Sequence, residues 1–257
     1  MNSEVSRQDY INGQEQRELQ RRDYLRTQLA FAEKMHEITG APLKDCWLDY
    51  TNLYSALRFP KPRDPENKDW LSFVKDLSVA EDKAKFASDY FINIVEGTGE
   101  GEREQSCFSY EYDDNNGMVR IHFTNHEPGG ISPLSEERVP ARRSELTKIF
   151  TEIKKLHPDA KTVKGSSWLY NLASYRRIFP PEYIANMERS PRGFTGTGVW
   201  GQFITKDGGA KTEQMHDFLT KLEKAKTKEE AINAFPLMRQ DVGCDIKYFY
   251  EFLGIKL

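Results

Sequence analysis

Residues 165–184 read GSSWLYNLASYRRIFPPEYI, and the sequence predicts a fold organised around this stretch. It gathers large apolar side chains that a solvated surface would accommodate poorly: Trp168, Leu169, Leu172, Tyr175, Ile178 and Phe179. Burying one such side chain stabilises a fold by roughly 1.5–3 kcal/mol. We therefore expect a core here, with a strand over Lys161–Leu169 entering it and a helix over Leu172–Phe179 that ends at Pro180-Pro181.

A β-hairpin is predicted upstream, over residues 107–125. Apolar residues alternate with polar ones on both sides of Asn116-Gly117, at Phe108, Tyr110, Tyr112, Val119, Ile121 and Phe123. An Asn-Gly pair between two alternating runs is the strongest short hairpin signal. A two-residue loop at Asn116-Gly117 places Tyr112 opposite Ile121, and all six apolar side chains then share one face.

The same register predicts the polar face of the hairpin. The opposed pairs are Glu111 with His122, Asp113 with Arg120, and Cys107 with His126. Directly opposed side chains on antiparallel strands have Cβ atoms about 4.5–5.5 Å apart. A carboxylate that orients a histidine is the arrangement that general acid–base chemistry needs. The alternative is a solvated sheet face with ordinary ion pairs across the strands.

Helices are predicted on both sides of the hairpin. The first 95 or so residues read as all helical, with helices over 16–39, 43–57 and 79–95 and a short one near residue 70. Residues 97–106, rich in Gly and charge, read as a connector between a helical region, 1–96, and an α/β region, 107–257. The α/β region has further predicted helices over 135–156, 212–225, 228–235 and 246–253, and strands over 199–204 and 238–242. This order predicts an α+β fold, with a small mixed sheet flanked by helices.

Composition and charge argue against several classes of partner. The chain has 257 residues and a net charge of −3, so its overall charge attracts neither nucleic acid nor an anionic membrane. No apolar run approaches the ~20 residues that span a bilayer, and the polar N-terminus lacks a signal-peptide core. His122 and His126 lie ~13 Å apart along a strand, too far to share one metal. Three widely spaced cysteines form no disulfide set, so we expect a cytoplasmic protein without a metal.

Short motifs follow the hairpin at His122–Asn125, Ser132–Ser135, Arg142–Leu156, Ser167–Leu169 and Ala173–Phe179. Over about residues 107–204, this series resembles the C-terminal half of GNAT-type acyltransferases and, more narrowly, the GNAT-like C-terminal domains of poorly characterised bacterial proteins. The resemblance implies an N-acyltransferase that uses acyl-CoA, with a small molecule or a protein amine as acceptor. A relative that keeps the fold without the activity is the alternative that the resemblance leaves open.

The resemblance also assigns catalytic roles. Glu111 and His122 would polarise the acceptor amine, and Tyr175 or Tyr170 would protonate the leaving thiolate. The alternative for both tyrosines is aromatic packing in the core. This interpretation loses its support if Glu111 and His122 line no cleft and no two strands splay apart near Trp168.

A phosphate-binding loop is the weaker part of the resemblance. GNAT enzymes hold the pyrophosphate of acetyl-CoA on an R/Q-x-x-G-x-G/A turn at the start of a helix. The loop before Arg142 lacks that spacing. The stretch 192–198 comes near it, although it is off by one residue and precedes a predicted strand. A phosphate would be held there by Arg192, Gly193, Gly196 and Gly198, the alternative being a mobile surface loop.

The helical region supports a different class of function. Arg17, Arg21, Arg22 and Arg26 mark one side of the first helix, offset by neighbouring acidic residues. We interpret them as a solvated helix face rather than as a nucleic-acid contact. If no acyl-CoA binds, the alternative is a non-catalytic interaction module that docks through this region.

Overall fold

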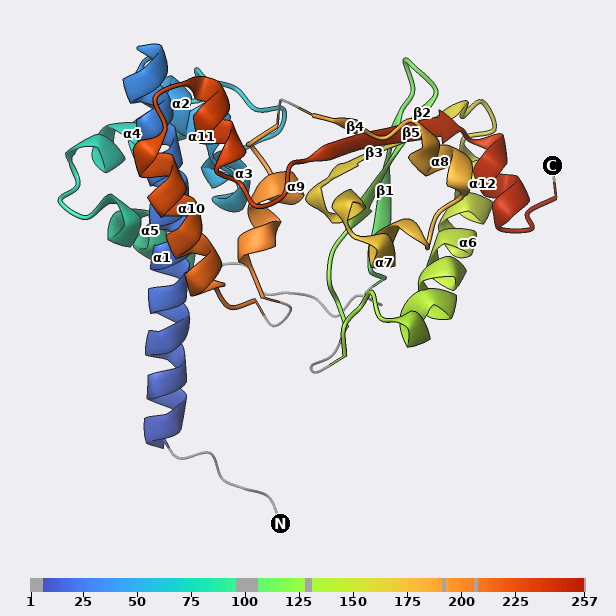
Figure 1. Ribbon diagram of the computed structural model, residues 1–257, viewed down its shortest axis with the longest axis horizontal. Coiled ribbons are helices and arrows are strands. Elements are labelled where there is room, and N and C mark those ends of the chain that lie inside the picture. Colours follow the sequence, from blue (N-terminus) through green and yellow to red (C-terminus); the bar gives the residue numbers. More distant parts are fainter. Residues whose placement is uncertain (1–6, 96–105, 128–130, 191–192, 206–207, 257) are drawn as a thin grey trace. The chain divides into compact units, whose positions relative to one another are not determined.

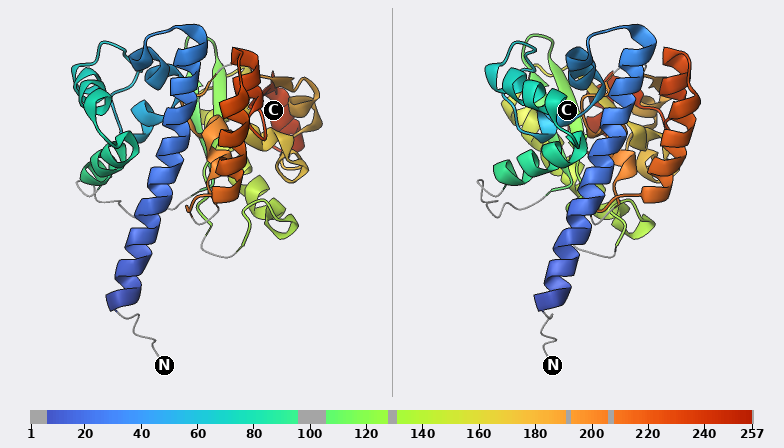
Figure 2. Two further views of the ribbon diagram at one scale, coloured as in Figure 1. Left: turned by 60° about the vertical axis from the view of Figure 1, so that its left-hand side comes forward. Right: turned by 90° about the vertical axis from the view of Figure 1, so that its left-hand side faces the viewer.

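The computed structural model describes residues 7–95, 106–127, 131–190, 193–205 and 208–256 (Figures 1 and 2). The predicted α+β class is confirmed: a helical N-terminal region precedes a mixed sheet. The chain forms two compact units, Met1–Glu100 with Gly193–Pro236, and Gly101–Arg192 with Leu237–Leu257. The sequence predicted one linear division at 97–106, whereas the structure groups residues 193–236 with the N-terminal helices.

The helical unit is built around the long helix α1 (Arg7–Thr39), which is flanked by α10 along part of its length (Figure 2). Its other helical elements are α2 (Leu43–Tyr50), α3 (Leu53–Ala56), α4 (Lys68–Val79), α5 (Lys83–Val95), α9 (Thr197–Trp200), η3 (Gly201–Phe203), α10 (Thr212–Lys224) and α11 (Lys228–Asn233). The helix predicted over 43–57 is thus divided between α2 and α3.

Aromatic packing explains why residues 193–236 belong to the helical unit. Phe31 of α1 is fully buried, and its ring centroid lies 5.0–6.0 Å from four rings of that segment. These rings are Phe194, Trp200, Phe218 and Phe235. Aromatic side chains each bury a large apolar area, so this contact is a major part of the unit's core.

The strand predicted over 199–204 is wrong, because these residues form α9 and η3. The sequence VWGQFI has no sustained alternation, and its buried apolar residues are Val199, Trp200 and Phe203. Spacings of one, three and four residues lie on one side of a helix rather than one face of a strand. Trp200 also donates its indole N–H to the carbonyl of Phe194 at 2.7 Å, which closes the preceding loop.

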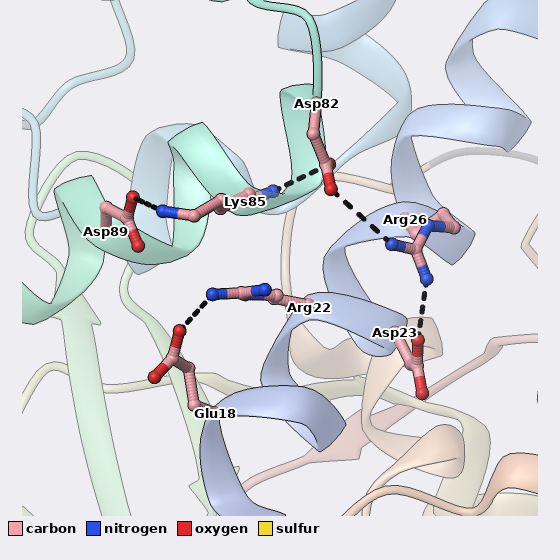
Figure 3. Close-up of polar contacts among 7 residues, drawn as sticks. All are labelled: Glu18, Arg22, Asp23, Arg26, Asp82, Lys85 and Asp89. Atoms are coloured by element: carbon pink, nitrogen blue, oxygen red, sulfur yellow. Dashed lines mark hydrogen bonds and ion pairs between the residues drawn. The ribbon is translucent and has the colours of Figure 1, made fainter. Parts of the chain in front are cut away.

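Charged side chains connect α1 to the start of α5 (Figure 3). Arg26 lies between two carboxylates, 2.7 Å from Asp23 and 3.8 Å from Asp82. Asp82 accepts a hydrogen bond from the backbone N–H of Lys85 (2.9 Å), and this bond lowers the pKa of the Asp82 carboxyl. One turn earlier, Arg22 pairs with Glu18. These arginines are paired with acidic residues, which agrees with the interpretation of a solvated, charge-balanced helix face.

The second unit contains a five-stranded sheet in the order β1-β2-β3-β5-β4. The strands are β1 (Phe108–Asp113), β2 (Met118–Phe123), β3 (Thr162–Ser167), β4 (Glu188–Arg189) and β5 (Gln240–Asp245). β2 and β3 are parallel, and the other neighbours are antiparallel. The crossover from β2 to β3 passes through η1 (Glu136–Arg138) and α6 (Val139–Leu156), as a parallel connection requires.

Helices cover one face of this sheet (Figure 1). They are α6, η2 (Trp168–Asn171), α7 (Ala173–Arg176), α8 (Pro181–Ala185) and α12 (Lys247–Phe252). In the core between them and the sheet, Phe150 of α6 stacks on Phe249 of α12 with ring centroids 4.3 Å apart. The predicted core stretch is confirmed for Tyr175, Ile178 and Phe179, which are buried. Trp168, however, is only half-buried.

The hairpin forms where predicted, but its predicted register is wrong by two residues. The loop spans four residues, 114–117, because Asp113 rather than Asn115 is the last residue of β1 and pairs with Met118. A two-residue type I′ turn needs positive φ at both loop positions. Among the described residues, Gly117 has a φ of 59° and Asn116 is not in this region. Because the side-chain period is two, the shift leaves every side chain on its predicted face.

Candidate functional site

The face of the sheet opposite the covering helices carries polar side chains. Glu111 lies directly across from Arg120 and His122 across from Ser109, so the predicted opposition of Glu111 and His122 is wrong. Their side chains nevertheless meet on the diagonal, with Glu111 Oε2 3.3 Å from His122 Nε2 and 3.9 Å from Arg120 Nη1. Residues offset by two across a ladder lie close enough for long side chains to touch. The two residues therefore form the predicted pair by a different route.

Both members of this pair remain accessible. The side chain of Glu111 is 54% exposed and that of His122 is 41% exposed. Nε2 of His122 is shielded from solvent and has no hydrogen-bond partner among the described residues. The arrangement holds an imidazole beside a carboxylate, with Nε2 of His122 facing Glu111 rather than solvent.

A cavity of about 720 Å³ opens on the same polar face, next to Arg120. Consecutive residues of β3 and β5 line it, together with residues of β4 and beside it. The polar lining side chains are Arg120, Thr162, Lys164, Ser166, Asn186, Glu188, Arg239 and Asp241. Within it, Ser166 donates to Asp241, and Arg239 Nε lies 3.6 Å from the same carboxylate. Glu111 and His122 are not among its lining residues, so this cavity does not meet the expectation that the pair lines a cleft.

The parallel strands β2 and β3 separate after a short ladder. They pair only from Met118 with Thr162 to Arg120 with Lys164, although β2 continues to Phe123 and β3 to Ser167. Trp168 follows β3 directly, at the start of η2. The ladder thus ends at Lys164, four residues before Trp168, and the splaying of two strands near Trp168 stays a prediction.

The backbone in this gap has unused hydrogen-bonding groups. Thr124 donates to the carbonyl of Cys107 on the β1 side, so by alternation Phe123 directs its N–H and C=O toward β3. Ile246 donates to the carbonyl of Lys161 on the β5 side, so Ser166 directs its groups toward β2. Neither residue has a ladder partner across the gap in the part of the chain that the structure describes. The gap therefore presents main-chain donors and acceptors that an extended ligand could use.

Tyr175 lies under the end of β2, on the covered face of the sheet. Its ring centroid is 5.4 Å from that of Phe123, and only 3% of the residue is exposed. Burial raises the pKa of Tyr175 well above its ordinary value, and a hydrogen bond with Tyr170 adds to the shift. The hydroxyl therefore stays protonated at neutral pH and is a weaker acid than that of an ordinary tyrosine. Core packing also describes this residue, so the two interpretations of Tyr175 are compatible.

Three residues of the predicted phosphate loop, Gly193, Gly196 and Gly198, belong to the helical unit. The fourth, Arg192, lies outside the described residues. The loop precedes the four-residue helix α9 instead of a strand, and Phe194 within it is buried against Phe31. The structure thus places the three glycines in a unit different from that of Glu111, His122 and Tyr175.

At the start of α6, arginine and glutamate side chains form a network of ion pairs. Glu127, just after β2, bridges Arg138 at 2.9 Å and Arg142 at 2.7 Å, and Arg142 also pairs with Glu145 at 2.8 Å. Arg142 and Glu127 are almost fully buried, with side chains 5% and 7% exposed. The short helix η1, which precedes α6, carries Glu136 and Glu137. Together with Glu127 they place negative charge just before α6, which disfavours a bound phosphate there.

The structure also bears on the predicted cysteine pair, on metal ligands and on membrane-spanning helices. The register shift places Cys107 across from Thr124 instead of His126, which corrects that predicted pair. Among the described residues there is no group of three or more His, Cys, Asp or Glu side chains that could hold a metal ion. No helix in the described ranges is both long enough and apolar enough to cross a membrane.

Sequence reasoning missed the lining of the cavity. Thr162, Lys164 and Ser166 alternate with buried Val163 and Gly165, and this period of two was the available signal for a polar sheet face. Comparison of the chain with protein-family models, with curated proteins and with solved structures finds no match.

Proposed function

We propose that the sheet unit binds an acyl thioester on a pantetheine arm, such as acyl-CoA, between β2 and β3, and transfers the acyl group to an amine. The main support is the parallel pair β2 and β3, which α6 connects. The ladder between these strands ends at Arg120 and Lys164, although both strands continue beyond it. This proposal has the same reaction class as the family that the sequence resembles.

An extended ligand with amide groups suits the gap. Unpaired backbone groups in a partly buried site are costly unless something bonds to them. The pantetheine arm carries amides along a flexible chain, so it could add to the open edges at Phe123 and Ser166 as a further strand would. A ligand in the gap would reach groups on both faces of the sheet, whereas a ligand bound on one face would reach only that face.

Access to both faces matters because the candidate groups lie on opposite sides. Glu111 and His122 are on the exposed face, and Tyr175 is on the covered face. In the proposed step, the amine nitrogen attacks the thioester carbonyl, so that a C–N bond forms and the C–S bond breaks. His122, oriented by Glu111, accepts the proton that the amine loses, and Tyr175 gives a proton to the departing thiolate.

We expect the protein to bind the phosphates of coenzyme A less strongly than the pantetheine arm. β2 ends and α6 begins at the same edge of the sheet (Figure 1). Glu127 pairs there with Arg138 and Arg142, and Glu136 and Glu137 add negative charge that would compete with a bound anion. We therefore expect most of the affinity to come from the arm and the acyl group.

Calorimetric titration tests this division. Acetyl-CoA and S-acetylpantetheine are expected to bind the full chain with affinities within about tenfold of each other, or about 1.4 kcal/mol. The proposal would be overturned if acetyl-CoA, hexanoyl-CoA and S-acetylpantetheine all fail to bind at ~1 mM. A Kd of ~1 mM corresponds to a standard binding free energy of about −4 kcal/mol. A non-catalytic interaction module would then be the better description.

Thiol release with simple amines tests the chemistry. With benzylamine or spermidine as acceptor, Glu111→Gln and His122→Gln should lower turnover by about a hundredfold while acetyl-CoA binding is retained. Tyr175→Phe should lower turnover in the same way. Ser109→Ala, directly across from His122, is the matched control and should keep the wild-type rate. Equal rates for all four variants would remove the assignment of these groups.

A further inference from the structure

The helical unit contains a cavity of about 310 Å³ that the proposed reaction does not use. It lies between α1, α3, α5 and residues after α9. Its apolar lining consists of Leu25, Ala56, Leu57, Phe91, Ile204 and Ala210. The volume is at the lower end of the ~300–1,000 Å³ that small-molecule sites occupy.

Two arginines of α1 line this cavity. Arg17 is exposed, and Arg21, one turn further, is partly buried with its guanidinium 5.0 Å from the ring centroid of Phe91. Residues four apart on a helix share one face. Arg22 and Arg26 are on a different face of the same helix, where Glu18, Asp23 and Asp82 pair with them (Figure 3). The arginines of α1 are thus divided between an ion-paired face and a cavity-lining face.

Buried polar groups also line the cavity. Asn52 is only 6% exposed; its Nδ2 donates to the hydroxyl of Tyr24 at 3.2 Å, and both residues line the cavity. Oδ1 of Asn52 has no hydrogen-bond partner among the described residues. Behind this pair, Gln28 accepts from the backbone N–H of Asn52 at 2.7 Å, and its Nε2 is buried without a partner in the same described set. Buried polar groups without partners are rare in folded proteins, and each one calls for a missing partner.

The side chains that line the cavity differ in exposure, from solvent-exposed to buried. Arg17 lies at the solvent end, Arg21 is intermediate, and Asn52 is at the buried end, with Leu25 and Leu57 in the apolar wall. Cationic groups near an apolar wall favour an anion that carries an apolar body. A guanidinium binds a carboxylate through two parallel hydrogen bonds, which favours a carboxylate over a simple ion.

From this arrangement we infer that the helical unit binds a small apolar carboxylate in this cavity. Its carboxylate would pair with Arg21 and Arg17, and its chain would pack against Leu25, Leu57 and Phe91. This inference is independent of the acyl transfer proposed for the sheet unit.

Titration of the full chain with octanoate and 1-octanol tests the inference, because the two probes share an apolar chain and differ in charge. Octanoate should bind one-to-one with a Kd below ~1 mM, and 1-octanol should bind at least about tenfold more weakly. Absence of octanoate binding would mean that water alone satisfies the buried polar groups and would overturn the inference. Equal affinity for the two probes would overturn the carboxylate assignment.

Matched variants locate the site. Arg21→Gln should weaken octanoate binding by about tenfold, or about 1.4 kcal/mol, and leave 1-octanol unchanged. Arg26→Gln makes the same charge change on the ion-paired face and should have no effect. Ala56→Leu should abolish binding of both probes by filling the cavity. Unchanged binding in Arg21→Gln or in a folded Ala56→Leu protein would place the site elsewhere and contradict the inference.

A local measurement covers the case in which Ala56→Leu does not fold. In the unaltered protein, octanoate should shift the NMR signals of the Asn52 side-chain amide, because that amide lines the cavity. Saturation with octanoate and no shift of these signals would contradict the assignment.

Discussion

The carboxylate of Glu111 lies 3.3 Å from Nε2 of His122, yet the residue directly across the ladder from His122 is Ser109. The pair therefore depends on a diagonal contact. A diagonal contact is sensitive to strand twist and to the loop that sets the register, so residues of the turn influence the geometry of the candidate site.

The turn should depend on Asp113. Its carboxylate accepts hydrogen bonds from the side chain of Asn116 (2.7 Å) and from the backbone N–H of Asn115 (3.1 Å), and the bond from Asn116 is the main cause of its lowered pKa. A depressed carboxyl pKa contributes stability above the unfolded value, about 3.9, and this contribution is lost as pH falls through the folded pKa. Urea denaturation should show Asp113→Ala to be less stable than wild type at pH 7.

The difference should shrink as pH falls below about 3.9, the unfolded value, and through the lower pKa of the folded carboxyl. Asp114→Ala is the control, because it removes the adjacent charge and leaves the two Asp113 bonds in place. A difference between wild type and Asp113→Ala that is equally large at pH 7 and pH 3 would contradict this account of the turn.

Gly165 should tolerate no side chain. A Cβ built there would lie 2.1 Å from the hydroxyl oxygen of Tyr170 and 2.2 Å from that of Tyr183, which are themselves 3.0 Å apart. Overpacking of a core costs about 1–3 kcal/mol and sometimes more, so Gly165→Ala should lower stability by about 3 kcal/mol in urea denaturation. Gly196→Ala, with open space around the new Cβ, should change stability little.

A second substitution separates overpacking from a backbone effect at Gly165. Adding Tyr170→Phe and Tyr183→Phe removes both hydroxyls and should restore part of the stability lost in Gly165→Ala. If the stability of this triple variant equals that predicted by adding the separate effects of Gly165→Ala and of the two Tyr→Phe changes, the clash is not the cause.

Arg142 should be essential for the stability of the sheet unit. It is buried between Glu127 and Glu145, so Arg142→Ala would leave two carboxylates without their shared partner. Breaking a buried ion pair by removing one partner costs about 3–5 kcal/mol, which denaturant unfolding at pH 7 should reveal.

The pH dependence provides a second readout. Burial raises the pKa of Glu145, and Arg142 opposes this shift. Without Arg142 the pKa should rise further, so the charged form destabilises the variant at neutral pH and protonation relieves it as pH falls. The loss in Arg142→Ala should therefore be smaller at pH 5 than at pH 7. Lys148→Ala on the same helix is the control, and a pH-independent loss would rule out this mechanism.

Cys244 should react slowly despite being only half-buried. Burial, together with Asp245 and Glu182, raises the pKa of its thiol to about 12. Because the thiolate is the nucleophile, alkylation by iodoacetamide at pH 8 should be on the order of a hundredfold slower than for an ordinary cysteine of pKa about 8.5. Peptide mapping by mass spectrometry measures this rate, and the same site in urea should react at the ordinary rate. Fast labelling of Cys244 in the folded protein would contradict the raised pKa.

Several features followed from the sequence alone because they depend on local periodicity. Alternation on both sides of Asn116-Gly117 determined the hairpin and the face of each side chain. The α+β class followed from the change of period after the helical region. Glu111 and His122 were also predicted to share a face, since a shift of two residues leaves that face unchanged.

Tertiary structure alone decided the features that depend on distant segments. The register was set where Gly117 accepts from the backbone N–H of Lys161 at 2.7 Å and where a Cβ on Gly117 would meet the carbonyl of Asp159 at 3.0 Å. The grouping of residues 193–236 with α1 depends on rings that pack on Phe31. The gap between β2 and β3 and the cavity beside Arg21 likewise arise where separate elements meet. Periodicity reports which side of an element is buried, whereas the partner on that side is chosen by packing among all segments at once.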